Sequence, residues 1–284
     1  MAKVNYLNNK DILRQIHLSK SSYCTFINPA EDHQYDMILP SLESLTPQTI
    51  LDAKTIRMNR LGMKTVEEDT LVFRVMTKEH IPLVAKPVKK DNQPSMDVIL
   101  DQFFSTIEVE TTEEESGEEE EIITPQGKFV YAKYNFPPFF HYRLKDGVPY
   151  IVGMSHWKVP EDWNGDFTKG EFDRFHGELT TELCLMILKL VERFAFKNRW
   201  RNYTYRDEME ANAILQLTQV VLQFDESKSQ NPFSYMTQVA SNAFWRVWEA
   251  EKRNQNIRDE LLMSMHKPAS FGAYDYSGSA DESV

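Results

Sequence analysis

The sequence lacks the features that would place a protein in a membrane, outside the cell or among disulfide-rich folds. It contains only two cysteines, Cys24 and Cys184, far apart and without metal-ligand spacing, so we interpret them as reduced, buried thiols of a cytoplasmic protein. The sequence contains no run of about 18 apolar residues, so we expect no membrane span. The N-terminal residues Met1 to Asn5 show no apolar signal core.

Motifs of common enzymes are also missing. The chain has no Gly-rich phosphate loop, no Gly-x-Ser-x-Gly turn, and no Cys-x-x-Cys or His-Glu-x-x-His pattern. The seven histidines are scattered, and no carboxylate pair lies near His141 or His156 to complete a metal site. We therefore expect a protein that is not an enzyme and that needs no cofactor or metal.

Basic charge is scarce overall, since the net charge is −11. Much of this excess lies in one acidic run, from Glu108 to Glu121. Such a run predicts a disordered, self-repelling linker; mimicry of nucleic acid is an alternative role for it. A protein this acidic does not coat nucleic acid by bulk attraction, so any DNA binding must use a small site or borrow affinity from a partner.

The patterning predicts a mainly α protein: a helical domain with a small β-containing N-terminal or inserted region. Apolar residues at helical spacing, among them Leu183, Met186 and Leu190, predict helices in the C-terminal half. An Asp146-Gly147 pair between short alternating segments predicts a β-hairpin. The expected segments are an N-terminal helix (1–18), a mixed α/β segment (19–106), an acidic disordered linker (107–124), a hairpin-containing segment (125–165), the helical domain (170–265) and a flexible tail (266–284).

Cations and aromatic residues alternate in the connection between the first two helices of that domain. Cations attract phosphate and aromatic rings stack on bases, so this mixture suits unpaired or distorted DNA. The alternative is a solvated loop whose aromatic residues anchor it to the core. The candidate DNA-binding residues here are Arg199, Trp200 and Arg201, flanked by Arg193, Lys197, Arg206, Tyr203 and Tyr205.

A later helix is expected to begin at Asn231, with Pro232 in its first turn. Its apolar stripe should face the core, whereas the opposite side carries amides, cations and two tryptophans. Gln and Asn can read adenine edges, and Tyr and Trp can stack on an extruded base. A polar solvated face without a ligand is the simpler alternative. The candidate DNA-binding residues are Tyr235, Gln238, Ser241, Asn242, Trp245, Arg246, Lys252 and Arg253.

The preceding helix, expected from Asp207 to Phe224, carries a stripe of amides and one carboxylate. Such a stripe could meet a basic helix of a partner protein, although a polar stripe is commonly just a solvated face. The candidate partner-binding residues are Glu208, Asn212, Gln216, Gln219 and Gln223.

The order of these pieces resembles region 2 of bacterial sigma factors. It is most similar to the late-transcription sigma factors of T-even-like bacteriophages, in particular those of phages that infect marine cyanobacteria. The resemblance is carried by Gly177-Glu178-Leu179-Thr180, Leu190 to Ala195, Tyr203 to Met209, Gln223 to Ser229, Asn231-Pro232-Phe233 and Glu251 to Asp259, and at the N-terminus by Asn5 to Lys10.

The resemblance implies a specific task. Such factors bind the core RNA polymerase of a bacterial host and direct it to late promoters that carry only a −10-type element. By this resemblance, the helix with Glu208 and Gln216 would dock on the clamp helices of the largest polymerase subunit. The helix with Gln238 and Trp245 would face the −10 DNA and help to open it. The protein would then act in the cytoplasm of the infected bacterium.

The chain also departs from the family pattern. Val239 and Ala240 occupy the positions of the tryptophan pair with which primary sigma factors wedge melted DNA, and no helix-turn-helix for a −35 element is recognisable. The segment from Ser270 to Tyr276 only loosely resembles the tail that binds a sliding clamp in T-even members. By the same resemblance, a sliding clamp and a phage coactivator are further expected partners. Two other functions stay open: a polymerase-binding decoy that inhibits host transcription, and a stand-alone DNA-binding regulator.

Overall fold

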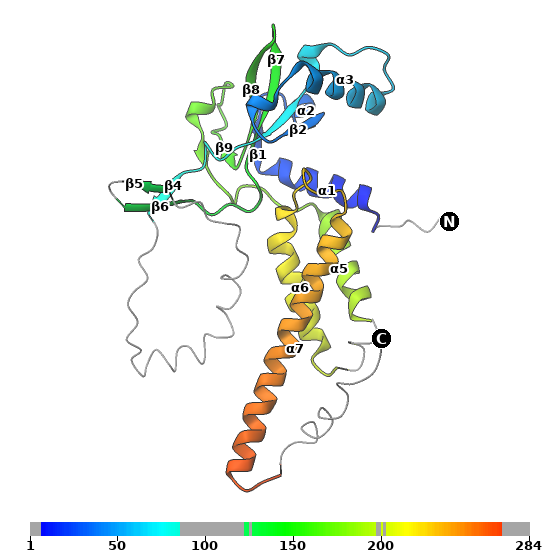
Figure 1. Cartoon of the computed structure of the whole chain (residues 1–284), viewed down its shortest axis with the longest axis vertical. Coiled ribbons are helices and arrows are strands. Elements are labelled where there is room, and N and C mark those ends of the chain that lie inside the picture. The colour runs from blue at the N-terminus through cyan, green and yellow to red at the C-terminus, as the bar shows by residue number, and fades with distance from the viewer. Residues whose placement is uncertain (1–6, 86–121, 125–126, 197–199, 201–202, 269–284) are drawn as a thin grey trace. The chain divides into compact units, whose positions relative to one another are not determined.

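The structure, a computed structural model, describes residues 7–85, 122–124, 127–196, 200 and 203–268 (Figure 1). The acidic run, Arg199, Arg201 and the segment from Ser270 to Tyr276 lie outside these described residues. The chain divides into two compact units whose segments interleave along the sequence. One unit contains Met1–Thr25, Asn135–Pro137 and Phe175–Val284, and the other contains Phe26–Tyr134 and Pro138–Arg174.

The first unit is helical. It contains the helices α1 (Asn9–Ser22), α5 (Thr181–Ala195), α6 (Arg206–Val220) and α7 (Pro232–Ser264), with a 3-10 turn, Val221–Gln223, directly after α6. The N-terminal helix therefore shares a unit with the C-terminal half of the chain, although the sequence placed it in a segment of its own.

Capping residues set the starts of these helices. The Asn231 side chain accepts a hydrogen bond from the Ser234 N–H at 3.1 Å, and Pro232 occupies the first turn of α7. The Asn8 side chain accepts the Asp11 N–H at 2.8 Å and so begins α1. The expected cap at Asn231 is confirmed, and the N-terminal helix reaches four residues further, to Ser22, than Leu18.

The apolar stripes predicted for α5 and α7 form the core of this unit. Leu183, Ile187 and Val191 of α5 are fully buried, as are Met236 and Ala240 of α7. Two further apolar residues of α7, Val239 and Val247, are also buried, with 8% and 6% of their surface exposed. Helical spacing therefore assigned the inner faces of both helices.

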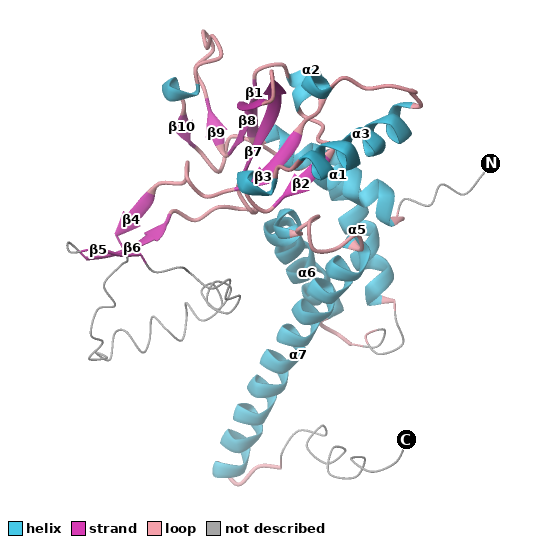
Figure 2. Cartoon of the chain, turned by 45° about the horizontal axis from the view of Figure 1, so that its top comes forward, coloured by secondary structure: helices cyan, strands magenta, loops and turns pink. Residues whose placement is uncertain are grey.

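The second unit contains most of a five-stranded mixed sheet with strand order β1-β8-β7-β3-β2. The strands β3 and β2 run parallel, whereas β7 is antiparallel to both β3 and β8. Figure 2 shows these strands side by side. Their bounds are β1 Cys24–Phe26, β2 Met37–Leu39, β3 Phe73–Met76, β7 Phe139–Lys145 and β8 Val148–Ser155.

The predicted hairpin is present between β7 and β8. Asp146 and Gly147 adopt positive φ angles of 53° and 80°, and Lys145 pairs with Val148 across the turn. Positive φ at both turn residues matches the twist of the flanking strands, which explains the Asp-Gly preference.

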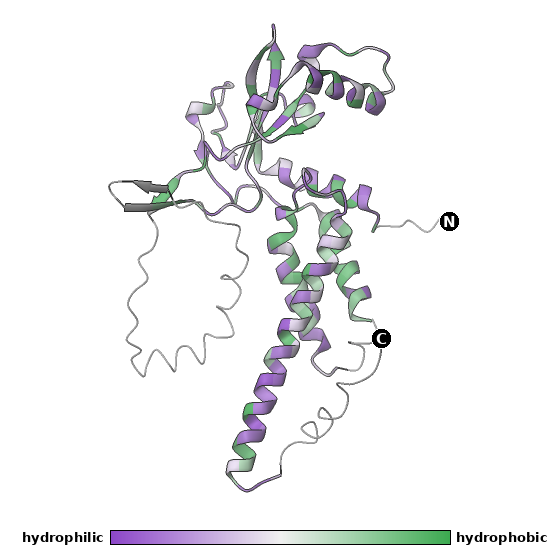
Figure 3. Ribbon diagram, viewed as in Figure 1, coloured by the Kyte–Doolittle hydropathy of each residue, from purple (hydrophilic) through white to green (hydrophobic). Residues whose placement is uncertain are grey.

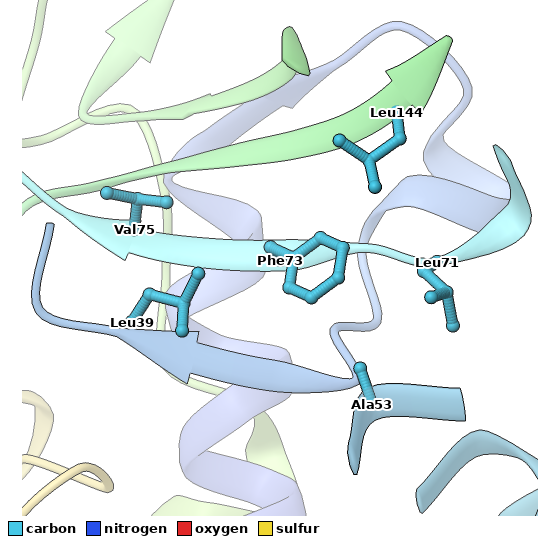
Figure 4. Packing of buried hydrophobic residues seen from close by; sticks show 6 residues of the cluster. All are labelled: Leu39, Ala53, Leu71, Phe73, Val75 and Leu144. Carbon is cyan, nitrogen blue, oxygen red and sulfur yellow. The ribbon is translucent and has the colours of Figure 1, made fainter. Parts of the chain in front are cut away.

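The helix α3 (Pro47–Leu61) covers the core of this sheet. Thr46 caps it with the reciprocal hydrogen bonds of a capping box, and Gly62 ends it at φ 67°. Figure 4 shows the buried cluster beneath. It joins one residue of α3 to residues on and beside three strands: Ala53, Leu39, Leu71, Phe73, Val75 and Leu144.

Short elements complete the second unit. A three-stranded sheet has the order β4-β6-β5, and a two-stranded sheet pairs β10 with β9. The bounds are α2 Pro29–Asp32, β4 Leu83–Ala85, β5 Ile122–Thr124, β6 Gly127–Tyr131, β9 Trp157–Lys158 and β10 Glu171–Phe172, with 3-10 turns at Leu42–Ser44, Glu68–Thr70 and Phe167–Lys169.

The expectation of a mainly α fold is wrong, because the structure is mixed α/β. Strands occur from Cys24 to Phe172, and they form a sheet too large to be a small insertion. The missed strands β1 and β2 have three residues each. Three residues are too few to show an alternating pattern, and the parallel pairing of β2 with β3 joins segments far apart in sequence.

Candidate functional site

The polar stripe predicted on α6 lies on one side of the helix. Glu208, Gln219 and Gln223 are exposed, whereas Asn212 and Gln216 are half-buried. Gln223 belongs to the 3-10 turn after α6 and not to the helix itself. The adjacent side, with Met209, Ala213 and Leu217, is fully buried. Glu208, Gln219 and Gln223 therefore remain accessible in the described part of the first unit, whereas the side-chain oxygen of Gln216 is buried.

Leu215 lies beside this stripe and was missed in the sequence. Its side chain is 55% exposed, and it lies three residues after Asn212 and four before Gln219. An apolar residue flanked by amides is typical of the centre of a binding face, where the apolar group contributes most of the area removed from water. A helical projection of α6 would have found it, because helical spacing brings it to the edge of the polar stripe, next to Asn212 and Gln219.

The helix α7 presents an outer polar strip away from its buried side. Gln238, Asn242, Arg246 and Arg253 are exposed and follow helical spacing along one side. The Gln238 amide N–H donates to the Asn242 carbonyl oxygen at 2.8 Å. This bond joins the two amides on the exposed side of the helix.

Tyr235 and Ser241 are less accessible. The Tyr235 hydroxyl donates to the Val220 carbonyl at 2.8 Å, and its ring packs against Phe224 at 5.6 Å. Tyr235 therefore joins the start of α7 to the end of α6. Ser241 is half-buried beside the strip.

The two tryptophans of α7 are half-buried, which corrects the expectation that both are exposed. Trp245 packs edge-to-face on Trp200 at 5.3 Å and on Trp248 at 5.1 Å. The Trp248 indole N–H donates to the Tyr203 hydroxyl at 3.1 Å, and the Lys252 ammonium lies 4.9 Å from the Trp248 ring. The rings of both tryptophans are thus partly covered by contacts within the unit. The spacing of residues in the sequence could not show these contacts.

Trp200 itself is only 3% exposed, so its predicted stacking on DNA is corrected to a core role. It contacts Phe244 at 5.6 Å, and Phe244 contacts Phe194 at 5.1 Å. This outcome matches the alternative in which the aromatic residues of the connection anchor it. Arg199 and Arg201, its predicted cationic neighbours, cannot be placed because they are outside the described ranges.

Burial and charge also act on Tyr205, at the start of α6. Its pKa is raised by burial first, and further by the neighbouring Tyr203 and by the negative charge of Glu251. Both causes disfavour the charged phenolate form of this side chain.

Across the residues that the structure describes, no group of three or more His, Cys, Asp or Glu side chains could hold a metal ion. The same residues include no helix whose length and apolar character would allow it to cross a bilayer. Comparison of the chain with protein-family models, with curated proteins and with solved structures finds no match.

Proposed function

We propose that this chain is a phage late sigma factor that binds the core RNA polymerase of a bacterial host and helps it to open −10-type late promoters. The observation that carries the proposal is the pairing of two packed helices with different accessible faces. The α6 face holds Glu208, Gln219 and the exposed Leu215, and the α7 strip holds Gln238, Asn242 and Arg246.

The chemistry of each face supports its assigned task. A face of one carboxylate and several amides around a leucine suits a basic, partly apolar helix pair such as the polymerase clamp helices. The α7 strip offers amides that can read adenine and an arginine that can contact phosphate. With a net charge of −11, the free chain is expected to bind DNA poorly, so the polymerase would supply most phosphate contacts.

The proposed setting is the cytoplasm of the infected bacterium. The sliding clamp and a coactivator remain proposed partners of the factor, and the segment expected to hold the clamp, Ser270 to Tyr276, is outside the part of the chain with described structure.

One observation favours a second function, a decoy that occupies host polymerase without opening DNA. Trp245 and Trp248 are engaged with Trp200 and Tyr203, so neither indole is free to wedge between base pairs. In that case the α6 face would bind polymerase normally, but no promoter would melt.

Reconstituted transcription separates the two functions. Core polymerase and this chain are mixed on a promoter with only an AT-rich −10 element, and melting is read by permanganate reactivity of its thymines. A sigma factor gives reactive thymines and a defined transcript. Polymerase binding without reactive thymines establishes the decoy, and salt-sensitive duplex binding without polymerase establishes a stand-alone regulator.

A further inference from the structure

The inner stripe of α7 continues past Val247, the last of its buried members, toward the C-terminal end of the helix. Residues at alternating spacings of three and four run along one side: Ala240, Ala243 and Val247, then Ala250, Asn254, Ile257 and Leu261. The first three are buried, whereas the last four are exposed. We call these last four the distal stripe.

The distal stripe lies where α7 extends past α5 and α6. The helix has 33 residues and is therefore about 50 Å long, and Figures 1 and 2 both show its C-terminal part running beyond the ends of its neighbours. Figure 3 shows short hydrophobic bands on this otherwise hydrophilic part. Ile257 and Leu261 are 55% and 56% exposed. A spacing of three and four is the seam of a two-stranded coiled coil.

Charges flank the distal stripe in a pattern that selects one orientation of a partner helix. Arg253 and Glu260 lie along one edge, and Glu251 and Arg258 lie along the other. Arg253, Arg258 and Glu260 are exposed. No ion pair involves any of the three in the described structure.

We propose that two copies of this chain pair through their distal stripes, with the two α7 helices antiparallel. With Ile257 opposite Asn254 of the partner subunit, Leu261 falls opposite Ala250 of the partner subunit. Leucine against alanine and isoleucine against asparagine pair a large residue with a smaller one in each layer.

In this register every flanking charge meets an opposite one. Arg253 faces Glu260 of the partner subunit, and two-fold symmetry repeats the pair. Arg258 faces Glu251 of the partner subunit on the other edge, although Glu251 is half-buried and already acts on Tyr205. A parallel arrangement would instead place Arg253 against Arg258 of the partner subunit, which is repulsive. Charge complementarity therefore favours the antiparallel copy.

The pairing has a consequence that rests on the proposed function. Arg253 belongs both to the edge of the distal stripe and to the candidate DNA-binding residues of α7, so a dimer would cover a group needed at the promoter. Self-association and promoter binding would then exclude one another.

The test of the pairing needs neither polymerase nor DNA, so its failure is distinct from failure of the proposed function. Sedimentation equilibrium of the full chain over a wide concentration range should show a reversible monomer–dimer equilibrium. Arg253→Glu should raise the dimer dissociation constant by about tenfold, since two attractive pairs become repulsive. The double variant Arg253→Glu/Glu260→Arg should restore it, because the charges are exchanged and the pairing kept.

A chain that stays monomeric at every concentration overturns the proposal, and so does a dimer that is indifferent to Arg253→Glu. Tighter dimerisation by Arg253→Glu identifies a parallel pair and overturns the antiparallel one. Leu261→Asp should abolish the dimer, and a circular dichroism spectrum like that of the unaltered chain shows that this exposed substitution leaves the fold intact.

Discussion

The ammonium nitrogen of Lys20 lies 2.9 Å from the Glu226 carboxylate, and both side chains are almost excluded from solvent, at 3% and 9% exposure. The same ammonium donates to the Phe224 carbonyl at 2.7 Å. Asn9 adds a further contact, because its side-chain oxygen accepts the Phe233 N–H at 3.1 Å. The N-terminal helix α1 is thus bonded to the loop between α6 and α7 and to the first turn of α7.

Removing this ammonium should destabilise the first unit strongly. Lys20→Met leaves a buried carboxylate without its cation, which we expect to cost about 3–5 kcal/mol in free energy of unfolding. The measurement is urea denaturation. The double variant Lys20→Met/Glu226→Leu should recover most of the loss. As a control, Lys54→Met breaks the more exposed pair with Glu68 and should change stability by less than about 1 kcal/mol.

The α6 face should be required for polymerase binding. We expect Glu208→Ala combined with Gln216→Ala to weaken capture of core polymerase, and Leu215→Glu to weaken it further, because a charge would replace the apolar centre of the face. Leu188→Glu, at a similarly exposed leucine of α5, is the matched control. If the two α6 variants capture as much polymerase as the unaltered chain and the Leu188→Glu control, the docking face is contradicted.

The α7 strip should matter for promoter opening and not for stability. Gln238→Ala with Asn242→Ala removes two exposed amides that bond each other, so we expect a lower yield of open complex at unchanged polymerase affinity. Permanganate footprinting gives the yield. The control Gln48→Ala removes a similar exposed bond, from Gln48 to Asp52 on α3, and should leave opening unchanged.

Trp245 links packing to function. Trp245→Ala deletes ring contacts with both Trp200 and Trp248, so we expect a loss of about 1–3 kcal/mol in unfolding free energy. Under the proposed function it also lowers open-complex yield while polymerase capture persists. Trp245→Phe keeps an aromatic ring and should retain most stability. Normal thymine reactivity with the alanine variant would exclude Trp245 from DNA opening.

The second unit should become less stable in mild acid because of His80. Burial lowers the pKa of His80 to about 4, so the folded chain keeps this imidazole neutral while the unfolded chain takes up a proton below about pH 6.5. The unfolded state then binds more protons, and stability falls as pH decreases from about 6.5 to about 4, by at most about 3 kcal/mol. Denaturation midpoints across this range measure the fall. His80→Gln should flatten it, and His266→Asn, at an exposed histidine, should not.

Local patterns explain which elements were predicted from the sequence. Helix spacing and capping act within a few residues, so the cap at Asn231 and the buried sides of α5 and α7 could be predicted directly. The Asp146-Gly147 turn is equally local. The sheet was underestimated because β2 acquires its partner β3 from a distant segment, and such pairing leaves no short-range signal.

The sequence by itself determined where α7 begins, which faces of α5 and α7 are apolar, and that amides follow one stripe on α6 and another on α7. Only the tertiary structure decided which aromatic residues remain accessible: Trp200 became core, and Trp245 and Trp248 became half-buried. The physical reason is that burial depends on what packs against a side chain. The residues that cover these rings, such as Tyr203 and Phe244, are brought there by the chain path and not by helical spacing.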